Sequence, residues 1–162
     1  MKNEGGKTKT IVFGVGNLIR SDDGVGIRIA EECRNKLDLS QVTVADTDVA
    51  GLSLLDIIAG YEKAIIIDGI QTIGGQPGKI YRLGPEMFHS TRNFAFSHDL
   101  NFTTVLQFGK AIGLIMPEIV VIFAVEVADV STFSEECTPE VKEAIPLCVE
   151  MVLKELNSDL AV

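Results

Sequence analysis

Long apolar segments are missing from this sequence. No apolar run approaches the roughly 20 residues that a helix needs to cross a membrane, so we expect no membrane contact. The first ten residues, MKNEGGKTKT, are polar and lack the apolar stretch of a secretion signal, which predicts a cytoplasmic protein. Residues 1–8 precede the first apolar segment, and we expect them to be flexible.

Positive charge is also scarce. The chain has 14 Lys and Arg residues against 23 Asp and Glu residues, which gives a net charge of -9. Such a surface repels phosphate backbones, so we expect no nucleic-acid partner. A cation, or a neutral or basic protein, fits this charge better.

Cysteine pairs of the CxxC type are absent. The chain has three cysteines, Cys33, Cys137 and Cys148. An odd number of cysteines in a chain without a secretion signal predicts reduced thiols rather than a disulfide framework. Cys33 and Cys148 fall within helical patterns, where an unpaired cysteine is most often a core residue.

Several common catalytic and nucleotide-binding motifs are missing as well. There is no HExxH and no GK[ST], which excludes the usual zinc-protease helix and the P-loop. Gly14 and Gly16 match the first half of a GxGxxG motif, but Ile19 occupies the third glycine position. No Ser/His/Asp order stands out and no cysteine lies beside an evident base, so covalent catalysis is unsupported.

What the sequence does contain is a regular alternation of strand and helix patterns. Strands are predicted at 10–16, 41–48, 63–70 and 118–127, with a further strand after a loop within 74–84, and helices at 23–37, 51–61, 99–113 and 138–156. Residues 87–98 show no clean period and predict a loop, with His89 on the surface. The whole chain, 1–162, is therefore predicted to form one α/β domain, a three-layer α/β/α sandwich with a mostly parallel twisted sheet of about five strands.

Three polar residues follow or flank these elements at positions that can converge. Asp23 comes after the first strand, Asp68 ends the third strand, and His98 opens the third helix. Ligands of parallel α/β sheets sit beyond the carboxyl ends of the strands, where all three can meet. Two carboxylates and an imidazole form an oxygen, oxygen and nitrogen donor set for a divalent metal with open positions.

Each of these residues can also be explained by a structural role that involves no bound ligand. Asp22 or Asp23 can cap the first helix, Asp68 can accept backbone hydrogen bonds, and His98 can cap a helix or pack. Asp46 and Asp48 at the end of the second strand, together with Asp22, are possible helpers at the same edge.

Taken in order, the motifs resemble those of the hydrogenase maturation endopeptidases, which process the large subunit of nickel–iron hydrogenases. The matching segments run through nearly the whole chain and are GVGNLIRSDDGVG, AIIIDGI, GGQPGKIYRLGPE, SHDL and TPEVKEAIP. Asn101, in place of a usual glycine, and the segment VEVADVSTFSEEC depart from the family pattern.

The resemblance implies an endopeptidase that removes the C-terminal extension of the large-subunit precursor after nickel insertion. It places both the metal contacts and the catalytic site on Asp23, Asp68 and His98, with nickel carried by the substrate and no nucleotide cofactor. Either the metal polarises the scissile carbonyl or activates the attacking water, or one of the carboxylates acts as the general base. The alternatives are a non-enzymatic nickel carrier and, less favoured, a nucleotide-binding α/β enzyme.

Overall fold

The computed structural model describes residues 9–48, 51–90 and 102–158 of the 162-residue chain. The expectation for residues 1–8 and the candidate ligand His98 fall outside these ranges, and so does Asn101. The described elements, in chain order, are β1 (Thr10–Val15), η1 (Ser21–Gly24), α1 (Val25–Lys36), β2 (Val42–Thr47), η2 (Gly51–Ser53), α2 (Leu54–Ile58), β3 (Lys63–Ile70), β4 (Ile80–Leu83), η3 (Pro85–Ser90), α3 (Phe102–Ala111), β5 (Ile119–Glu126) and α4 (Pro139–Ser158).

The five strands form one sheet in the order β2-β1-β3-β5-β4. Neighbouring strands β2, β1, β3 and β5 pair in parallel, and only β4 at the edge runs antiparallel, against β5. β3 occupies the middle, and all its residues from Lys63 to Ile70 are buried, as a strand covered on both faces requires. The expected mostly parallel sheet is confirmed.

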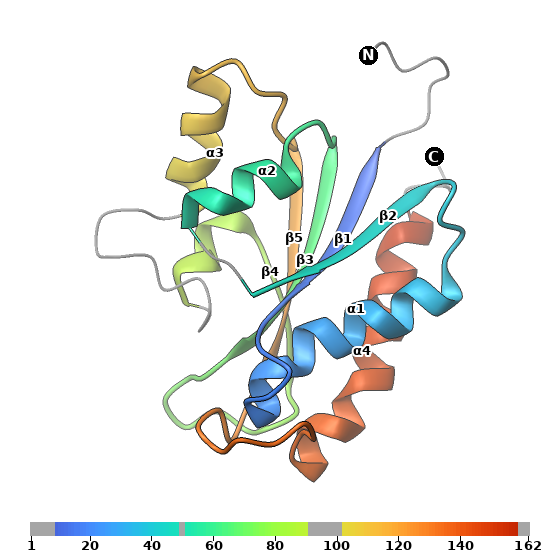
Figure 1. The fold of residues 1–162 in the computed structure, drawn as a ribbon, viewed down its shortest axis with the longest axis vertical. Helices are drawn as coiled ribbons and strands as arrows, with labels where there is room; N and C mark the ends of the chain where they lie inside the picture. Colours follow the sequence, from blue (N-terminus) through green and yellow to red (C-terminus); the bar gives the residue numbers. More distant parts are fainter. Residues whose placement is uncertain (1–8, 49–50, 91–101, 159–162) are drawn as a thin grey trace.

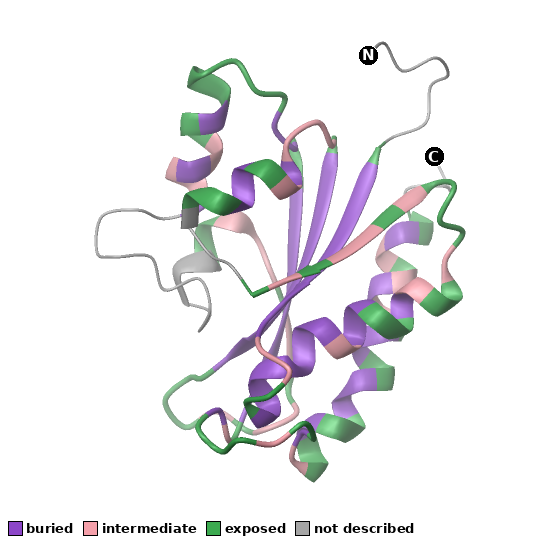
Figure 2. Cartoon of the chain, in the orientation of Figure 1, coloured by how far each residue is buried: buried purple, intermediate pink, exposed green. Residues whose placement is uncertain are grey.

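Helices cover both faces of this sheet (Figure 1). α1 and α4 pack on one face, and α2 and α3 pack on the other. The side chains of β3 alternate between the two layers: Ile65 and Ile67 contact the α1/α4 side, whereas Ala64 and Ile66 contact the α2/α3 side. Figure 2 shows the central strands and the inner sides of the helices as the buried part of the molecule. The α/β/α sandwich is thus confirmed.

Two local expectations need correction. The predicted helix 23–37 begins as the separate 3₁₀ turn η1, and α1 itself starts at Val25. The predicted loop 87–98 is not irregular from its start, because residues 87–90 belong to the 3₁₀ helix η3. The two aspartates before α1 form a turn of their own because they are held by other parts of the chain, as described below.

An ion-pair cluster joins α4 to the sheet at the amino ends of the strands. The ammonium of Lys63, with a side chain only 2% exposed, lies 3.1 Å from Glu155 of α4. Arg82 of β4 donates hydrogen bonds to both carboxylate oxygens of Glu155, at 3.0 and 3.1 Å. These bonds, with burial acting against them, hold the pKa of Glu155 below its ordinary value. The cluster fixes the last turns of α4 at the edge opposite the candidate site.

Candidate functional site

Asp68 lies inside the central strand, two residues before its end at Ile70. Its side chain is fully buried, and the amide of Gly69 donates a hydrogen bond of 2.7 Å to its Oδ1 atom. Gly69 faces Val25 of α1, so alternation along the strand turns the Asp68 side chain toward the α2/α3 face. The expectation that Asp68 ends the strand is wrong by two residues, but it does lie in the carboxyl half of β3.

Asp23 lies in the turn η1 that follows β1, and only 5% of it is exposed. Its backbone is tightly fixed. The amide of Asn17 donates a 3.2 Å hydrogen bond to its carbonyl oxygen, and its own amide donates one of 3.1 Å to the carbonyl of Arg20. No hydrogen bond joins its carboxylate to another residue within the described part of the chain. Asp23 therefore presents a carboxylate that a bound cation can use.

The segments carrying these two aspartates touch. η1 lies against β3, and the start of α1 passes directly over the strands, where Gly26 meets the carbonyl oxygens of Val15 and Ile67. β1 pairs Gly14 with Ile67, so Asp68 lies level with the end of β1. The structure thus brings Asp23 and Asp68 to neighbouring segments at the same edge of the sheet.

The glycines of the first motif have a role that needs no phosphate. A Cβ atom at Gly14 would collide with the carbonyl oxygen of Gly26, so these residues allow α1 to contact β1 backbone to backbone. Gly16, with a φ of 154°, meets the carbonyl of Asp23 in the same way. A phosphate-binding turn would leave its amides open to a ligand, whereas this turn is filled by its own helix. This packing removes the main support for a nucleotide site.

The described residues supply only part of a metal site. Within 9–48, 51–90 and 102–158, no three His, Cys, Asp or Glu side chains are grouped as metal ligands. Asp23 and Asp68 give two oxygen donors of the kind that suits a divalent cation. The third predicted ligand, His98, lies outside the described residues, so the complete set stays a prediction. Of the suggested helpers, Asp46 forms an ion pair of 3.1 Å with Arg34, and Asp48 is exposed.

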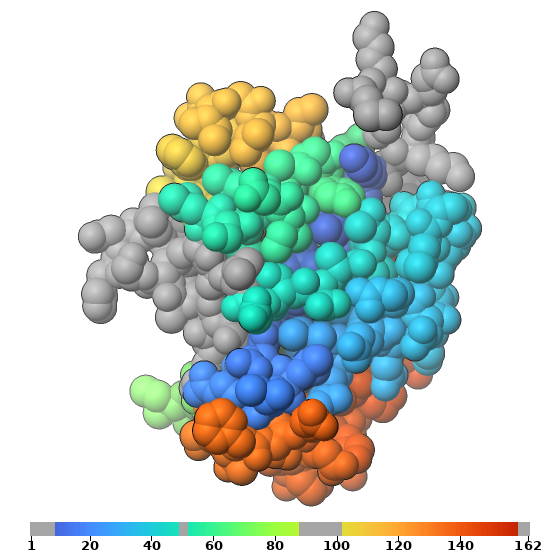
Figure 3. Space-filling model, in the orientation of Figure 1, coloured from blue at the N-terminus to red at the C-terminus, as the bar shows by residue number. Residues whose placement is uncertain are grey.

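Asp22 behaves differently from its neighbour. Neither aspartate caps α1, whose N-cap is Gly24 without a side-chain hydrogen bond, so that expectation is wrong. The buried Asp22 carboxylate instead accepts hydrogen bonds from Thr138, directly before α4, and from the amides of Ala128 and Asp129 after β5. Figure 3 shows the segment after β5, in orange, against the blue segment that follows β1.

Glu126 is a further buried carboxylate at this edge that the sequence reading did not single out. It is the last residue of β5, and it accepts hydrogen bonds from the amide and the hydroxyl of Thr72, at 2.7 and 2.9 Å. A Cβ atom at Gly75 would collide with its carboxylate. Glu126 therefore fixes the loop between β3 and β4. An acidic residue at the end of an apolar strand is the sequence feature that could have identified it.

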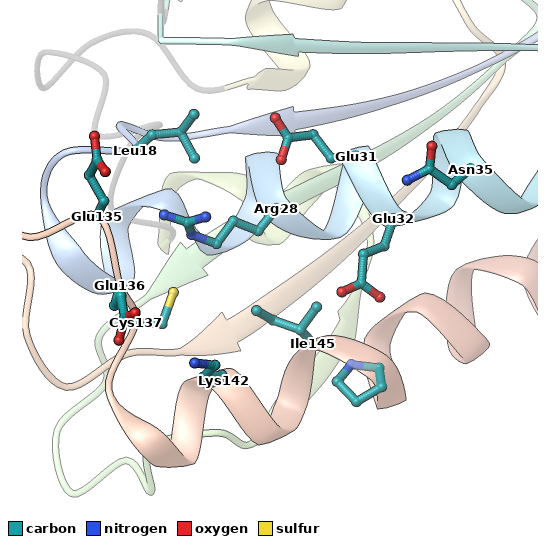
Figure 4. Close-up of a pocket in the computed structure, with 11 residues that line it drawn as sticks. Leu18, Arg28, Glu31, Glu32, Asn35, Glu135, Glu136, Cys137, Lys142 and Ile145 are labelled. Atoms are coloured by element: carbon teal, nitrogen blue, oxygen red, sulfur yellow. The ribbon is translucent and has the colours of Figure 1, made fainter.

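A hollow lies elsewhere, between α1, α4 and the segment before α4 (Figure 4). Its volume is about 850 Å³, and charged side chains of both signs line it, namely Arg28, Lys142, Glu31, Glu32, Glu135 and Glu136. Neither Asp23 nor Asp68 lines this groove. It is open to solvent and separate from the carboxyl edge where the segments of the two aspartates touch.

The cysteines lack the chemistry of a nucleophile. Burial raises the pKa of Cys33 to about 11 and that of Cys148 to about 12, so both thiols are protonated at neutral pH. Burial also raises the pKa of Cys137, with the nearby Asp22 adding to the effect. All three are free, which confirms the expected reduced thiols and the core placement of Cys33 and Cys148.

No helix in the described ranges is both long enough and apolar enough to span a membrane.

Comparison with known proteins gives one consistent family. The family model described as hydrogenase maturation protease matches residues 27–155. The hydrogenase expression/formation protein HupD of Rhizobium leguminosarum bv. viciae is 25% identical over 154 residues, covering 93% of this chain and 75% of the relative. The hydrogenase 2 maturation protease of Escherichia coli strain K12 is 31% identical over 101 residues, covering 61% of this chain and 62% of the relative.

Solved structures agree with these sequence matches. The hydrogenase maturating endopeptidase HybD from E. coli superposes with a TM-score of 0.76 at 26% identity, covering 93% of each chain. A [NiFe] hydrogenase maturation protease, HycI from Thermococcus kodakarensis, shares the fold with a TM-score of 0.69, at 24% identity and 94% coverage of each chain.

Proposed function

This chain belongs to the hydrogenase maturation protease family, and we propose that it cleaves the C-terminal extension from the precursor of a nickel–iron hydrogenase large subunit after nickel insertion. It is a hydrolase, an endopeptidase, as its relatives and structural neighbours are. The nickel is part of the substrate and is not a cofactor that the protease keeps.

The observation that supports this most is that two buried aspartates from separate elements lie on segments that touch. Asp23, in the turn after β1, and Asp68, in the central strand, lie on touching segments. Backbone packing against Gly16 fixes Asp23, and a hydrogen bond from Gly69 orients Asp68. Hard oxygen donors on rigid elements suit a divalent ion presented by a partner, and His98 is the proposed third contact.

Recognition of the precursor through its metal determines when cleavage occurs. A precursor without nickel lacks the group to which these carboxylates bind, so its affinity for the protease is lower. The extension is therefore retained until nickel is in place. The net charge of -9 favours association with a metal-bearing or basic surface of the precursor over a second acidic one.

Two routes for activating the water follow from this site. In one, the substrate's metal polarises the scissile carbonyl or acidifies a water, and the carboxylates only hold the metal. In the other, Asp23 or Asp68 takes the proton from the water as general base. Asp68 is a metal contact in the first route, and a metal contact or the base in the second. Neither route uses a covalent intermediate, because the protonated cysteines offer no nucleophile.

Exposed apolar side chains next to η1 offer a contact for the precursor chain. The amide of Ser134 donates a 3.1 Å hydrogen bond to the carbonyl of Ile19, and Arg20 and Ser134 form a parallel bridge. Ile19 and Phe133 are therefore neighbours across this bridge, and they are 51% and 83% exposed. Arg20 also accepts the hydrogen bond from the amide of Asp23. We propose that a precursor chain whose metal binds at Asp23 covers both side chains.

The direct test is incubation of the purified protein with nickel-loaded, unprocessed large subunit, followed by intact mass spectrometry. We expect the subunit to lose its C-terminal extension, and a nickel-free precursor to stay uncut. A protein that binds nickel tightly on its own and cuts neither form would be a carrier, and one that binds a nucleotide would be an enzyme of another class. Action in the cytoplasm stays a prediction that cell fractionation tests.

A further inference from the structure

We infer that Asp22 is a positioning residue for the reaction, because it anchors the turn that carries Asp23 to the start of α4 and to the end of β5. This inference rests on the proposed function, since it assigns Asp22 the task of holding the Asp23 carboxylate where the substrate's metal arrives. Asp22 does not touch the substrate in this proposal. It acts through its neighbour in η1.

The contacts of Asp22 are unusually complete for one side chain. It is fully buried, and its Oδ2 atom accepts hydrogen bonds of 2.9 Å from the amides of both Ala128 and Asp129. Its Oδ1 atom accepts one of 2.7 Å from the amide of Thr138. The hydroxyl of Thr138 lies 3.0 and 2.9 Å from the two oxygens and donates to them. Four donors from two separate segments thus converge on one carboxylate.

The backbone of the same turn is tied to the same segments. The amide of Asp22 donates a 2.9 Å hydrogen bond to the carbonyl of Asp129, and the amide of Ser21 donates one of 2.8 Å to that of Ser134. Ser21 has a φ of 50°, which a non-glycine residue adopts only when its surroundings impose it. The turn is therefore held in its shape by partners far along the chain, and Asp22 supplies most of them.

The two adjacent aspartates have different roles. The Asp22 carboxylate is fully used by Thr138 and by the residues after β5, next to the positive end of the α4 dipole. The Asp23 carboxylate accepts no hydrogen bond from the described residues and stays available. Because the residues are consecutive in one short turn, movement of Asp22 moves Asp23 as well. Loss of the anchor is expected to shift Asp23 without removing its charge.

Asp22→Asn tests this with little change in shape. An amide keeps one acceptor oxygen and replaces the other with a donor, which opposes the donors of Ala128 and Asp129 or that of Thr138. Thr138→Val is a milder variant, because it removes the hydroxyl donor and keeps the backbone amide. Glu155→Gln is the matched control, since it weakens the attachment of α4 at its far end, where Lys63 and Arg82 bind.

The readout is the split between kcat and KM on nickel-loaded precursor, at a temperature at which each variant is folded by circular dichroism. A displaced catalytic group lowers kcat and a displaced metal contact raises KM, so we expect Asp22→Asn to lower kcat about 100-fold and to raise KM about tenfold. The kcat of Thr138→Val should lie between those of wild type and Asp22→Asn. Glu155→Gln should keep the wild-type kcat despite a lower unfolding midpoint. A folded Asp22→Asn protein with wild-type kcat, or a Glu155→Gln protein with an equal loss, would overturn the inference.

A second measurement needs no turnover. Titration of the isolated protein with Ni²⁺ alone should give weak binding, about tenfold weaker in Asp22→Asn and unchanged in Glu155→Gln. Equal Ni²⁺ affinity in wild type and Asp22→Asn would also count against positioning. Failure of the wild type to cut loaded precursor would instead refute the proposed function. If the wild type is active, the absence of any defect in Asp22→Asn refutes only this inference.

Discussion

Gly16 lies directly against the carbonyl oxygen of Asp23, at a distance that leaves no space for a Cβ atom at Gly16. The next residue, Asn17, donates its amide to the same oxygen. The turn after β1 therefore folds back on itself and fixes the backbone of Asp23 before any substrate is present. Preorganised groups of this kind lose little entropy when they engage a transition state.

Asp68→Asn should abolish processing and leave the fold intact. Asparagine keeps an Oδ1 atom that can accept the hydrogen bond from Gly69, but it lacks the negative charge for a metal or a proton. The measurement is intact mass of loaded precursor after incubation with a folded variant. Asp46→Asn is the control, because Asp46 is an exposed carboxylate paired with Arg34. Wild-type processing by Asp68→Asn would remove Asp68 from the site, and early melting would favour a structural role.

Replacement of Phe133 by serine should weaken precursor binding. Phe133 is 83% exposed beside Ile19, and the substrate is expected to cover it. Loss of this contact should reduce the binding free energy by about 1.4 kcal/mol, which corresponds to roughly a tenfold rise in KM with kcat unchanged. Ile115→Ser is the matched control, because Ile115 is 71% exposed but bonds through its carbonyl to Gly60, at the other end of the sheet. Steady-state kinetics distinguish the two, and an equal KM for both variants would argue against this contact.

The sequence predicted the positions of the main strands and their mostly parallel direction, because their apolar runs are long and clearly bounded. Lys63–Ile70 is such a run, and it does form the central buried strand. The pairing of Asp22 with Thr138 could not be predicted, because the two residues are 116 positions apart and Asp22 looked like an ordinary cap for the helix that follows it. Local capping signals compete with long-range partners, and only the packed chain decides between them.

Glu155→Gln should destabilise the protein at neutral pH and much less in acid. Hydrogen bonds from Arg82 lower the pKa of Glu155 in the folded chain, so its stabilising effect is present above the ordinary Glu pKa of about 4.3 and is lost as the pH falls through the lower, folded value. The buried Lys63 loses its charged partner in the variant, at a cost of about 1–3 kcal/mol at pH 7.

Urea unfolding of wild type and Glu155→Gln at pH 7 and at about pH 3.5 measures this difference directly. The gap in the free energy of unfolding should shrink at the lower pH, because the wild-type carboxylate is then increasingly protonated. A gap of the same size at both pH values would show that the charge of Glu155 does not stabilise α4.

His98→Ala should weaken binding of the loaded precursor, and wild-type processing should decline in acid. A neutral imidazole binds a metal and a protonated one does not, so the rate is expected to fall as the pH drops through about 6.5, the ordinary His pKa. Rates from pH 5 to 8 on loaded precursor provide the test. A flat profile, or His98→Ala activity equal to wild type, would count against a ligand role.

Part of the site could likewise be predicted from the sequence, and part of it only from the structure. Asp23 and Asp68 were predicted to meet because each follows or lies in the carboxyl half of a parallel strand, and their segments do touch. The distinction between Asp22 and Asp23 was not predictable, since two adjacent aspartates in one turn have the same local context. It depends on which of them faces Ala128 and Thr138.

We propose that the metal arrives in the substrate, and chelation of the protease alone distinguishes this from a resident metal. The purified protein is treated with a chelator, the chelator is removed by gel filtration, and nickel-loaded precursor is added. Two carboxylates and an imidazole with open positions bind a free ion weakly, so we expect cleavage at the untreated rate and no cleavage of nickel-free precursor. Loss of cleavage that returns when nickel or zinc is added back to the protein alone would contradict it, because the metal would then belong to the enzyme.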